Sequence, residues 1–275
     1  MPRGTRGRGG PGVLIRVGTS GFSYADWRGA FYPSGTDERG MLAYYATRFP
    51  VVELNFSYYR MPNARTLGAM VAKTPTGFEF AIKAHQSMTH DLAPVPTARQ
   101  TAFDEFKAAI APLEEADRLG CVLFQFPWKH RPGPETVAYL GEIRDRYPDL
   151  PVVVEFRNIE WDRPDTYATL RHLDLGYCCV DEPSLRGLLP RQNLVTSNLG
   201  YVRFHGRNAA KWYSHKEAWE RYDYLYSQTE LEEWVPQVRE MEEKTSKTYV
   251  LYNNCHAGQA STNAQMMLDL LGLAG

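Results

Sequence analysis

The chain has 275 residues, 43% hydrophobic and 13% aromatic, so it can bury a large core in one α/β barrel or in two smaller domains. Its 31 basic and 32 acidic residues leave a formal net charge of -1, which excludes a global preference for nucleic acid or for anionic membranes. No apolar stretch reaches the roughly 18 residues that a membrane-spanning helix needs, so we expect no membrane partner. Four cysteines without CxxC spacing indicate reduced thiols and a cytoplasmic location.

The first residues form a glycine- and arginine-rich segment, MPRGTRGRGGPG. We expect residues 1–12 to be a disordered basic tail, because such a composition cannot bury apolar surface. Binding of nucleic acid by this tail is an alternative that the overall charge does not favour. No linker follows, so residues 13–275 are predicted to be a single domain.

Short apolar runs alternate with segments of helical periodicity along the rest of the chain. The predicted strands are 13–21, 51–55, 78–85, 121–127, 152–158, 177–183, 201–207 and 248–254. The predicted helices are 38–48, 63–73, 97–118, 134–146, 164–172, 229–244 and 259–271, with Asn63 and Thr97 as candidate N-caps. The interval after the sixth strand holds at most a helical turn, so the sixth helix is predicted to be short or degenerate.

Eight strands alternating with helices predict a single (β/α)8 TIM barrel. An open, doubly wound sheet is the main alternative. It is disfavoured because no strand is followed by a GxGxxG turn or a P-loop. Polar residues also recur at nearly every strand end, whereas a doubly wound sheet gathers its site at one switch point.

The polar residues at the strand ends are the candidate catalytic groups. Side chains alternate across a strand, so Glu155 and Arg157 share one face, as do Arg203 and His205. A buried unpaired charge costs several kcal/mol, so these groups are expected to meet and compensate one another. The candidates are Glu53, Lys83, Glu155, Arg157, Asp181, Arg203 and His205. The structural alternative is an ion-pair network that only plugs the barrel mouth.

Aromatic loops follow the first, second and seventh strands, at residues 21–33, 56–62 and 206–226. Their aromatic rings are interleaved with Arg and Lys, which suits a planar ligand bearing phosphate or carboxylate. A hydrophobic cap is the alternative for any single ring. The predicted substrate-binding residues are Asn55, Tyr59, His85, His90, Gln125, Arg207, Trp212, Tyr213, Asn253 and Asn254.

The sequence resembles the YecE-like family through a series of motifs in the same order. These are GTSGFSYADWRGAFYP, VELNFSYYRMP, FAIKAHQSMTH, LFQFP, EFRNIEW, RFHGR and YNNCHAGQASTNA. The resemblance spans roughly residues 15–265 and implies a TIM barrel, with no established activity. The polar pattern that it implies falls on Glu53, Asn55, Lys83, His90, Gln125, Glu155, Arg157, Trp161, Asp181, Arg203, His205, Asn253 and Asn254. Departures are Trp128 in place of a second proline, Asn158 in place of histidine and Cys255 in place of aspartate, the last of which removes an acid from the pattern.

Three functions fit these residues. The first is a metal-independent enzyme acting on a small anionic substrate. In it Lys83, Arg157 and Arg203 stabilise charge, and Glu155, Asp181 or His205 moves protons. This function is favoured, and it implies no cofactor and no bound metal.

The second function is a divalent-metal phosphodiesterase with Glu53, Glu155, Asp181 and His205 as ligands, in which the basic loop at 207–222 holds nucleic acid. It is disfavoured because nearby cationic side chains repel a metal ion and the chain lacks HxH or HxxxH spacing. The third is a non-catalytic protein that binds a metabolite or nucleotide. The sequence leaves the substrate and the oligomeric state open.

Overall fold

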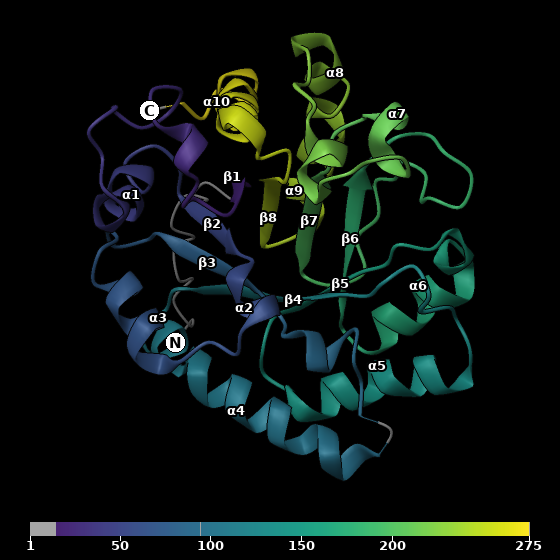
Figure 1. Cartoon of the computed structure of the whole chain (residues 1–275). Coiled ribbons are helices and arrows are strands. Elements are labelled where there is room, and N and C mark those ends of the chain that lie inside the picture. The colour runs from purple at the N-terminus through teal and green to yellow at the C-terminus, as the bar shows by residue number, and fades with distance from the viewer. Residues whose placement is uncertain (1–14, 94, 275) are drawn as a thin grey trace, which may run out of the picture.

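Eight parallel strands close into one barrel in the computed structural model, which describes residues 15–93 and 95–274 (Figure 1). Each strand pairs with its sequence neighbours, and β1 pairs with β8, which confirms the predicted barrel. The predicted basic tail at 1–12 and the first two residues of the first predicted strand lie outside the described residues. The strands are β1 (Ile15–Ser20), β2 (Val51–Leu54), β3 (Glu79–Lys83), β4 (Leu119–Gln125), β5 (Val152–Glu155), β6 (Gly176–Asp181), β7 (Leu199–Phe204) and β8 (Lys247–Tyr252).

Helices lie outside the barrel, close to where the sequence predicts them (Figure 1). They are α1 (Glu38–Tyr45), α3 (Ala64–Val71), α4 (Pro96–Glu115), α5 (Pro134–Arg146), α6 (Pro164–His172), α8 (Gln228–Glu232), α9 (Val235–Lys244) and α10 (Gln259–Leu270). Short helices α2 (Phe56–Tyr59) and α7 (Ala209–Trp212) lie in loops after β2 and β7. No helix connects β6 to β7, so the sixth helix is indeed degenerate.

Two local details differ from the sequence expectation. The segment predicted as one helix at 229–244 is divided into α8 and α9, because Pro236 lies in the first turn of α9 and proline favours a helix start over a helix interior. Asn63 caps α3 by accepting from Thr66 N at 2.9 Å. Thr97, by contrast, is not a cap, since α4 begins one residue before it and has Val95 as its N-cap.

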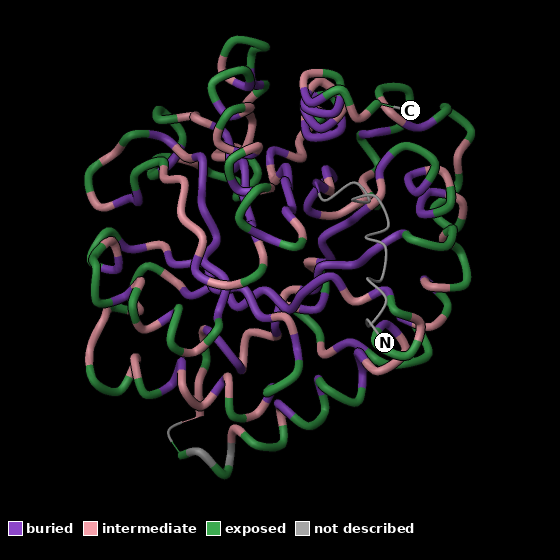
Figure 2. Tube along the Cα trace, turned by 180° about the vertical axis from the view of Figure 1, so that it is seen from behind, coloured by how far each residue is buried: buried purple, intermediate pink, exposed green. Residues whose placement is uncertain are grey.

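The inner layer of strands and the outer layer of helices differ in burial (Figure 2). The strands are buried almost throughout, while the helices expose their outer faces. Apolar strand residues such as Val52, Ile82 and Val154 are fully buried, because the helices cover the outer face of the sheet and side chains fill its interior. No helix in residues 15–93 and 95–274 is long and apolar enough to cross a membrane.

The interior of the barrel contains polar layers that link non-adjacent strands. Tyr249 in β8 donates to Glu79 in β3 at 2.7 Å, and Tyr201 in β7 donates to Glu53 in β2 at 2.7 Å. These bonds cross the barrel, because β3 and β8, like β2 and β7, are not neighbours in the sheet. Alternate residues of each strand therefore point inward, and this alternation decides which polar side chains meet at the strand ends.

Candidate active site

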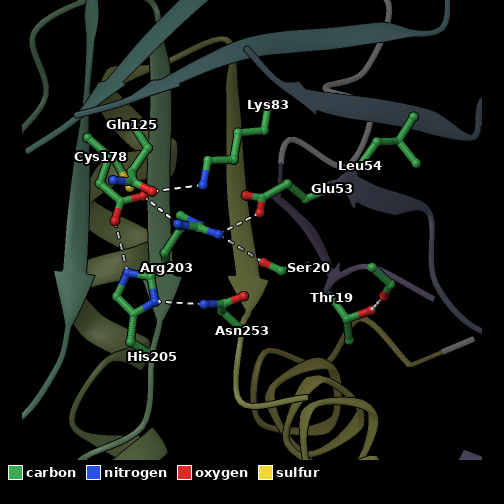
Figure 3. A network of polar contacts seen from close by, with 12 residues as sticks. Thr19, Ser20, Glu53, Leu54, Lys83, Gln125, Cys178, Arg203, His205 and Asn253 are labelled. Carbon is green, nitrogen blue, oxygen red and sulfur yellow. Dashed lines mark hydrogen bonds and ion pairs between the residues drawn. The ribbon is translucent and has the colours of Figure 1, made fainter. Parts of the chain in front are cut away.

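Arg203 lies at the centre of a buried ion-pair network near the C-terminal ends of the strands (Figure 3). Its two terminal nitrogens lie 2.6 Å from Glu53 Oε1 and 2.5 Å from Glu155 Oε2. Burial opposes the charge of Glu155, but the positive charges of Arg157 and Arg203 outweigh burial and hold its pKa well below the usual range. The same ion pairs keep the pKa of Arg203 well above its usual value despite burial. These ion pairs link β2, β5 and β7.

His205 extends the network toward the solvent side of the barrel (Figure 3). Its Nε2 lies 3.1 Å from Glu155 Oε1, and its Nδ1 lies 3.1 Å from the amide nitrogen of Asn253. Because the amide donates, Nδ1 accepts and Nε2–H donates to the carboxylate. Burial, helped by the charge of Arg157, lowers the pKa of His205 to about 3. His205 is therefore neutral near pH 7 and holds a fixed tautomer.

Glu182 joins the cluster, although the sequence interpretation did not select it. Arg157 Nε lies 2.6 Å from Glu155 Oε1, and its Nη1 lies 3.8 Å from Glu182 Oε2. The other oxygen of Glu182 accepts from Leu189 N at 3.1 Å. Burial raises the pKa of Glu182 to about 7, although Arg157 opposes this shift. Its carboxyl is thus able to gain or lose a proton near neutral pH.

Lys83 is held differently from the arginines (Figure 3). Its Nζ donates to Gln125 Oε1 at 2.7 Å and lies 4.2 Å from the ring centre of Tyr58. Burial lowers the pKa of Lys83 to about 7, and the charges of Arg203 and Arg157 add to this effect while Glu155 opposes it. At neutral pH the amine is therefore shared between its charged and neutral forms.

His90 also contacts the ring of Tyr58, with 4.8 Å between the ring centres. Its Nδ1 lies 2.9 Å from Thr89 Oγ1. Burial, together with the charge of Lys83, lowers the pKa of His90 to about 4. His90 is therefore neutral near pH 7.

Asp181 does not join this cluster, which corrects the expectation that it shares a site with the other strand-end groups. Its carboxylate accepts from Arg207 at 2.7 and 2.8 Å, from Tyr226 at 2.8 Å and from Trp234 at 2.7 Å. Asp181 pairs in register with Phe204, whereas Val180 pairs with the inward-facing Arg203. Asp181 therefore points out of the barrel, and Glu182 takes the inward position.

Three other predicted binding residues are held in structural contacts. Arg207 is the partner of Asp181, which keeps its pKa above the usual value. Asn254 is buried and donates to Tyr224 O and to Asn263 Oδ1 at 2.8 and 2.9 Å. Trp212 is buried in the loop that follows β7. These three residues hold the β7 and β8 loops in place and are not brought to the cluster.

The remaining predicted residues lie around the mouth of the barrel. Tyr59 and Tyr213 are 74% and 63% exposed, so they are open to solvent. His85 caps a short helix by bonding Ser87. Asn55 follows β2, and its buried Oδ1 has no hydrogen-bond partner among the described residues, which leaves an acceptor for a ligand.

An aromatic cavity of about 560 Å³ adjoins the cluster through Asn253. Trp219 stacks on His256 with 4.2 Å between ring centres, and Tyr222 lies 6.1 Å from the ring centre of His205. The cavity is lined by Tyr24, Asp26, Trp219, Tyr222, Asn253, Cys255 and His256. The first and third aromatic loops thus meet beside the ends of β1 and β8. The predicted proximity of aromatic rings to the polar cluster is found at Tyr58 and Tyr222, not at Trp212 or Tyr213.

The donor groups do not fit a divalent metal. Residues 15–93 and 95–274 contain no group of three or more His, Cys, Asp or Glu side chains placed to bind a metal ion. Of the four ligands proposed for the metal alternative, Glu53 and Glu155 bind Arg203, His205 binds Glu155, and Asp181 faces another part of the molecule. A metal ion at the cluster would have to displace the guanidinium group of Arg203.

Comparison with known proteins places this barrel in a family. The family described as "Protein of unknown function DUF72" matches residues 16–275. The chain belongs to the DUF72 family. Its membership confirms the resemblance to the uncharacterised YecE-like barrel proteins.

Relatives cover the DUF72 chain almost end to end. The UPF0759 protein YunF of Bacillus subtilis is 35% identical over 272 residues, covering 94% of this chain and 95% of YunF. A DUF72 protein of Thermotoga maritima is 40% identical, with a TM-score of 0.86 and coverage of 94% and 99%. A DUF72 protein of Enterococcus faecalis is 30% identical, with a TM-score of 0.85 and coverage of 95% and 97%. These relatives support the barrel, and their names describe no reaction.

Proposed function

We propose that this DUF72 protein is a metal-independent enzyme that acts on a small anionic substrate by acid–base catalysis. The observation that carries the proposal is Lys83, a residue of intermediate burial whose pKa lies at about 7 beside a network of fixed charges. A group that titrates near the working pH is what proton transfer requires. The site lies at the C-terminal ends of barrel strands, where TIM-barrel enzymes carry their chemistry.

The proposed roles follow from the charge state of each group. Lys83 and Glu182 carry protons, because both have pKa values of about 7. Arg157 binds the anionic part of the substrate, since its side chain is 13% exposed while that of Arg203 is 2% exposed. Glu155 and His205 hold these groups in place and keep fixed protonation states.

A purely structural plug explains only part of the cluster. The pairs of Arg203 with Glu53 and Glu155 are fully buried and would suffice to close the barrel. Such a plug does not require a lysine held by a neutral amide or a carboxyl group whose pKa is raised to about 7. Those two features weaken the structure, so their presence supports a catalytic role.

The first test uses a panel of phosphorylated and carboxylated metabolites. Ligands are found by thermal shift, and products are followed by mass spectrometry. Lys83→Met should lower kcat/KM by roughly 10²–10⁴-fold, the usual effect of removing a general acid or base. Lys107→Met, which removes an exposed amine on α4, is the matched control and should change nothing.

The pH profile gives a second readout of the same test. Protonation of Lys83 removes the base at low pH, and ionisation of Glu182 removes the acid at high pH. We therefore expect kcat/KM to follow a narrow bell centred near pH 7, and Glu182→Gln to remove its alkaline limb. Unchanged turnover in Lys83→Met contradicts the proposal. Tight binding of a metabolite without any product favours the sensing alternative instead.

A further inference from the structure

In the part of the chain that the structure describes, Lys83 has no carboxylate as an ion-pair partner, and its amine is hydrogen-bonded to a neutral group. No carboxylate oxygen in residues 15–93 and 95–274 lies within 4.0 Å of its Nζ, and its hydrogen-bond acceptor is the neutral amide of Gln125. The nearby carboxylates are already paired, Glu53 with Arg203 and Glu155 with Arg203 and Arg157. No ion pair within the described ranges therefore holds this amine in its protonated form, so its neutral form, with a free lone pair, is accessible.

The surroundings of the amine also suit attack on a carbonyl group. One side of Nζ is covered by the ring of Tyr58, 4.2 Å away. The side chain remains partly exposed, as do those of Asn55, His90 and Arg157. These four residues are therefore not sealed off from the mouth of the barrel, and Tyr58 covers one side of the amine.

We propose that Lys83 is a nucleophile that forms an imine with an aldehyde or ketone carrying a carboxylate or phosphate group. The proposal rests on the function proposed above and names its substrate class. Arg157 defines the charged part of that class, because its side chain is 13% exposed while that of Arg203 is 2% exposed. Its charge acts on Lys83 and lowers the pKa of the amine, so both groups belong to one site.

The chemical steps balance without an added reactant. The neutral amine of Lys83 forms a C–N bond to the carbonyl carbon while the C=O π bond opens, and the oxygen gains the proton lost by nitrogen. This gives a carbinolamine. Protonation of its hydroxyl by Glu182, directly or through water, releases water and leaves a protonated imine. The imine withdraws electrons from the adjacent carbon, whose bond to hydrogen or carbon can then break.

The decisive experiment is reductive trapping in the wild-type protein. The protein is incubated at pH 7 with cyanoborohydride and limiting pyruvate, glyoxylate or glyceraldehyde 3-phosphate, and acetaldehyde serves as the uncharged probe. Peptide mass mapping compares the labelling rate of Lys83 with those of Lys107 and Lys129, which are exposed. We expect Lys83 to be labelled at least tenfold faster by an anionic carbonyl than the two exposed lysines, and Arg157→Gln to reduce this preference over acetaldehyde.

The outcomes separate this inference from the proposed function. In one outcome no probe labels Lys83 faster than Lys107, yet metabolite turnover still depends on Lys83. This outcome overturns the imine and leaves acid–base catalysis in place. Rapid labelling of Lys83 supports the imine even before a natural substrate is known. Equal labelling together with unaltered turnover in Lys83→Met removes both proposals. The labelling rate of Lys83 is measured in the wild-type protein, so this part of the result does not depend on the folding of a variant.

Discussion

Individual carboxyl groups of the cluster differ mainly in how many charged partners offset the cost of burying them. Glu155 is fully buried yet ionised, because two arginines and a histidine surround it. Glu182 is buried with one arginine at 3.8 Å, and its pKa rises to about 7. Two carboxyl groups at the ends of neighbouring strands thus acquire opposite shifts, which is a common way for one site to hold both a fixed charge and a titrating group.

Replacement of Glu182 by glutamine should change how stability depends on pH. Between about pH 4.5 and pH 7 the folded protein holds a proton on Glu182 that the unfolded chain has lost, so stability falls as pH rises through this window. A glutamine amide cannot ionise, so Glu182→Gln should gain up to about 3 kcal/mol over wild type on going from pH 4.5 to pH 8. Urea denaturation at several pH values measures the difference.

Glu105→Gln, an exposed change on α4, is the control for this experiment and should give a flat difference. A flat difference for Glu182→Gln as well would show that the pKa of Glu182 is not raised. The proton-carrying role assigned to it would then be lost.

Secondary-structure elements decide which face each strand-end residue uses. All six residues of β6 are buried, because on its outer face Tyr177 packs against Tyr167 of α6 and Asp181 accepts from Trp234, while its inner face fills the barrel. The sequence therefore shows no alternation of apolar and polar residues in this strand. Without that alternation, Asp181 and Glu182 were equally plausible site residues. Register with β7 removes the ambiguity, since Asp181 pairs with Phe204.

Asp181→Asn tests the structural role of this outward-facing carboxylate. The change removes the charge that Arg207, Tyr226 and Trp234 share, while Arg207 keeps Glu230 and Glu233 as carboxylate partners. We expect a loss of about 1.5–3 kcal/mol in the free energy of unfolding, as for the loss of a buried hydrogen bond to a charged group. Guanidinium denaturation followed by circular dichroism measures it.

Asp145→Asn on α5 is the matched control, because Asp145 is exposed. If Asp181→Asn keeps full stability but loses turnover or trapping at Lys83, the structural role is wrong. Asp181 would then return to the catalytic group in which the sequence placed it.

The whole barrel is held together through its interior as well as through its strands. Arg203 joins β7 to β2 and β5, and Tyr249 joins β8 to β3. These contacts replace part of the apolar filling that a barrel interior usually has. The cost of burying such charges is offset only while every partner is present.

Arg203→Met should therefore destabilise the entire molecule. It leaves Glu53 and Glu155 buried without Arg203, and we expect a loss of about 3–5 kcal/mol in the free energy of unfolding. The double variant Arg203→Met with Glu53→Gln should recover part of this loss, because it removes one uncompensated charge. Equal stability of Arg203→Met and wild type in denaturant titrations would contradict the picture of a charge network that spans the barrel.

Much of the fold follows from local signals. The spacing of apolar runs predicts all eight strands. Helical periodicity predicts most outer helices to within a few residues and the degenerate sixth helix, but it misses the split between α8 and α9 and the short helices α2 and α7. Lys83, Glu155, Arg157, Arg203 and His205 could be selected because each ends a strand at an inward position. Glu182 could not, since it lies beyond a strand buried on both faces, whereas Tyr222 belongs to the aromatic loop that the sequence predicts at 206–226.

The sequence by itself determined the order of strands and helices and the chemical types gathered at the strand ends, because periodicity and residue identity are local properties. Tertiary structure decided which carboxylates pair with which cations, and so which groups carry a fixed charge. The pairing of carboxylates with cations depends on distances across the barrel, such as 2.5 Å between Arg203 and Glu155 and 3.8 Å between Arg157 and Glu182. Electrostatic shifts of pKa vary with such distances and with burial, and neither quantity is encoded in the spacing of residues along the chain.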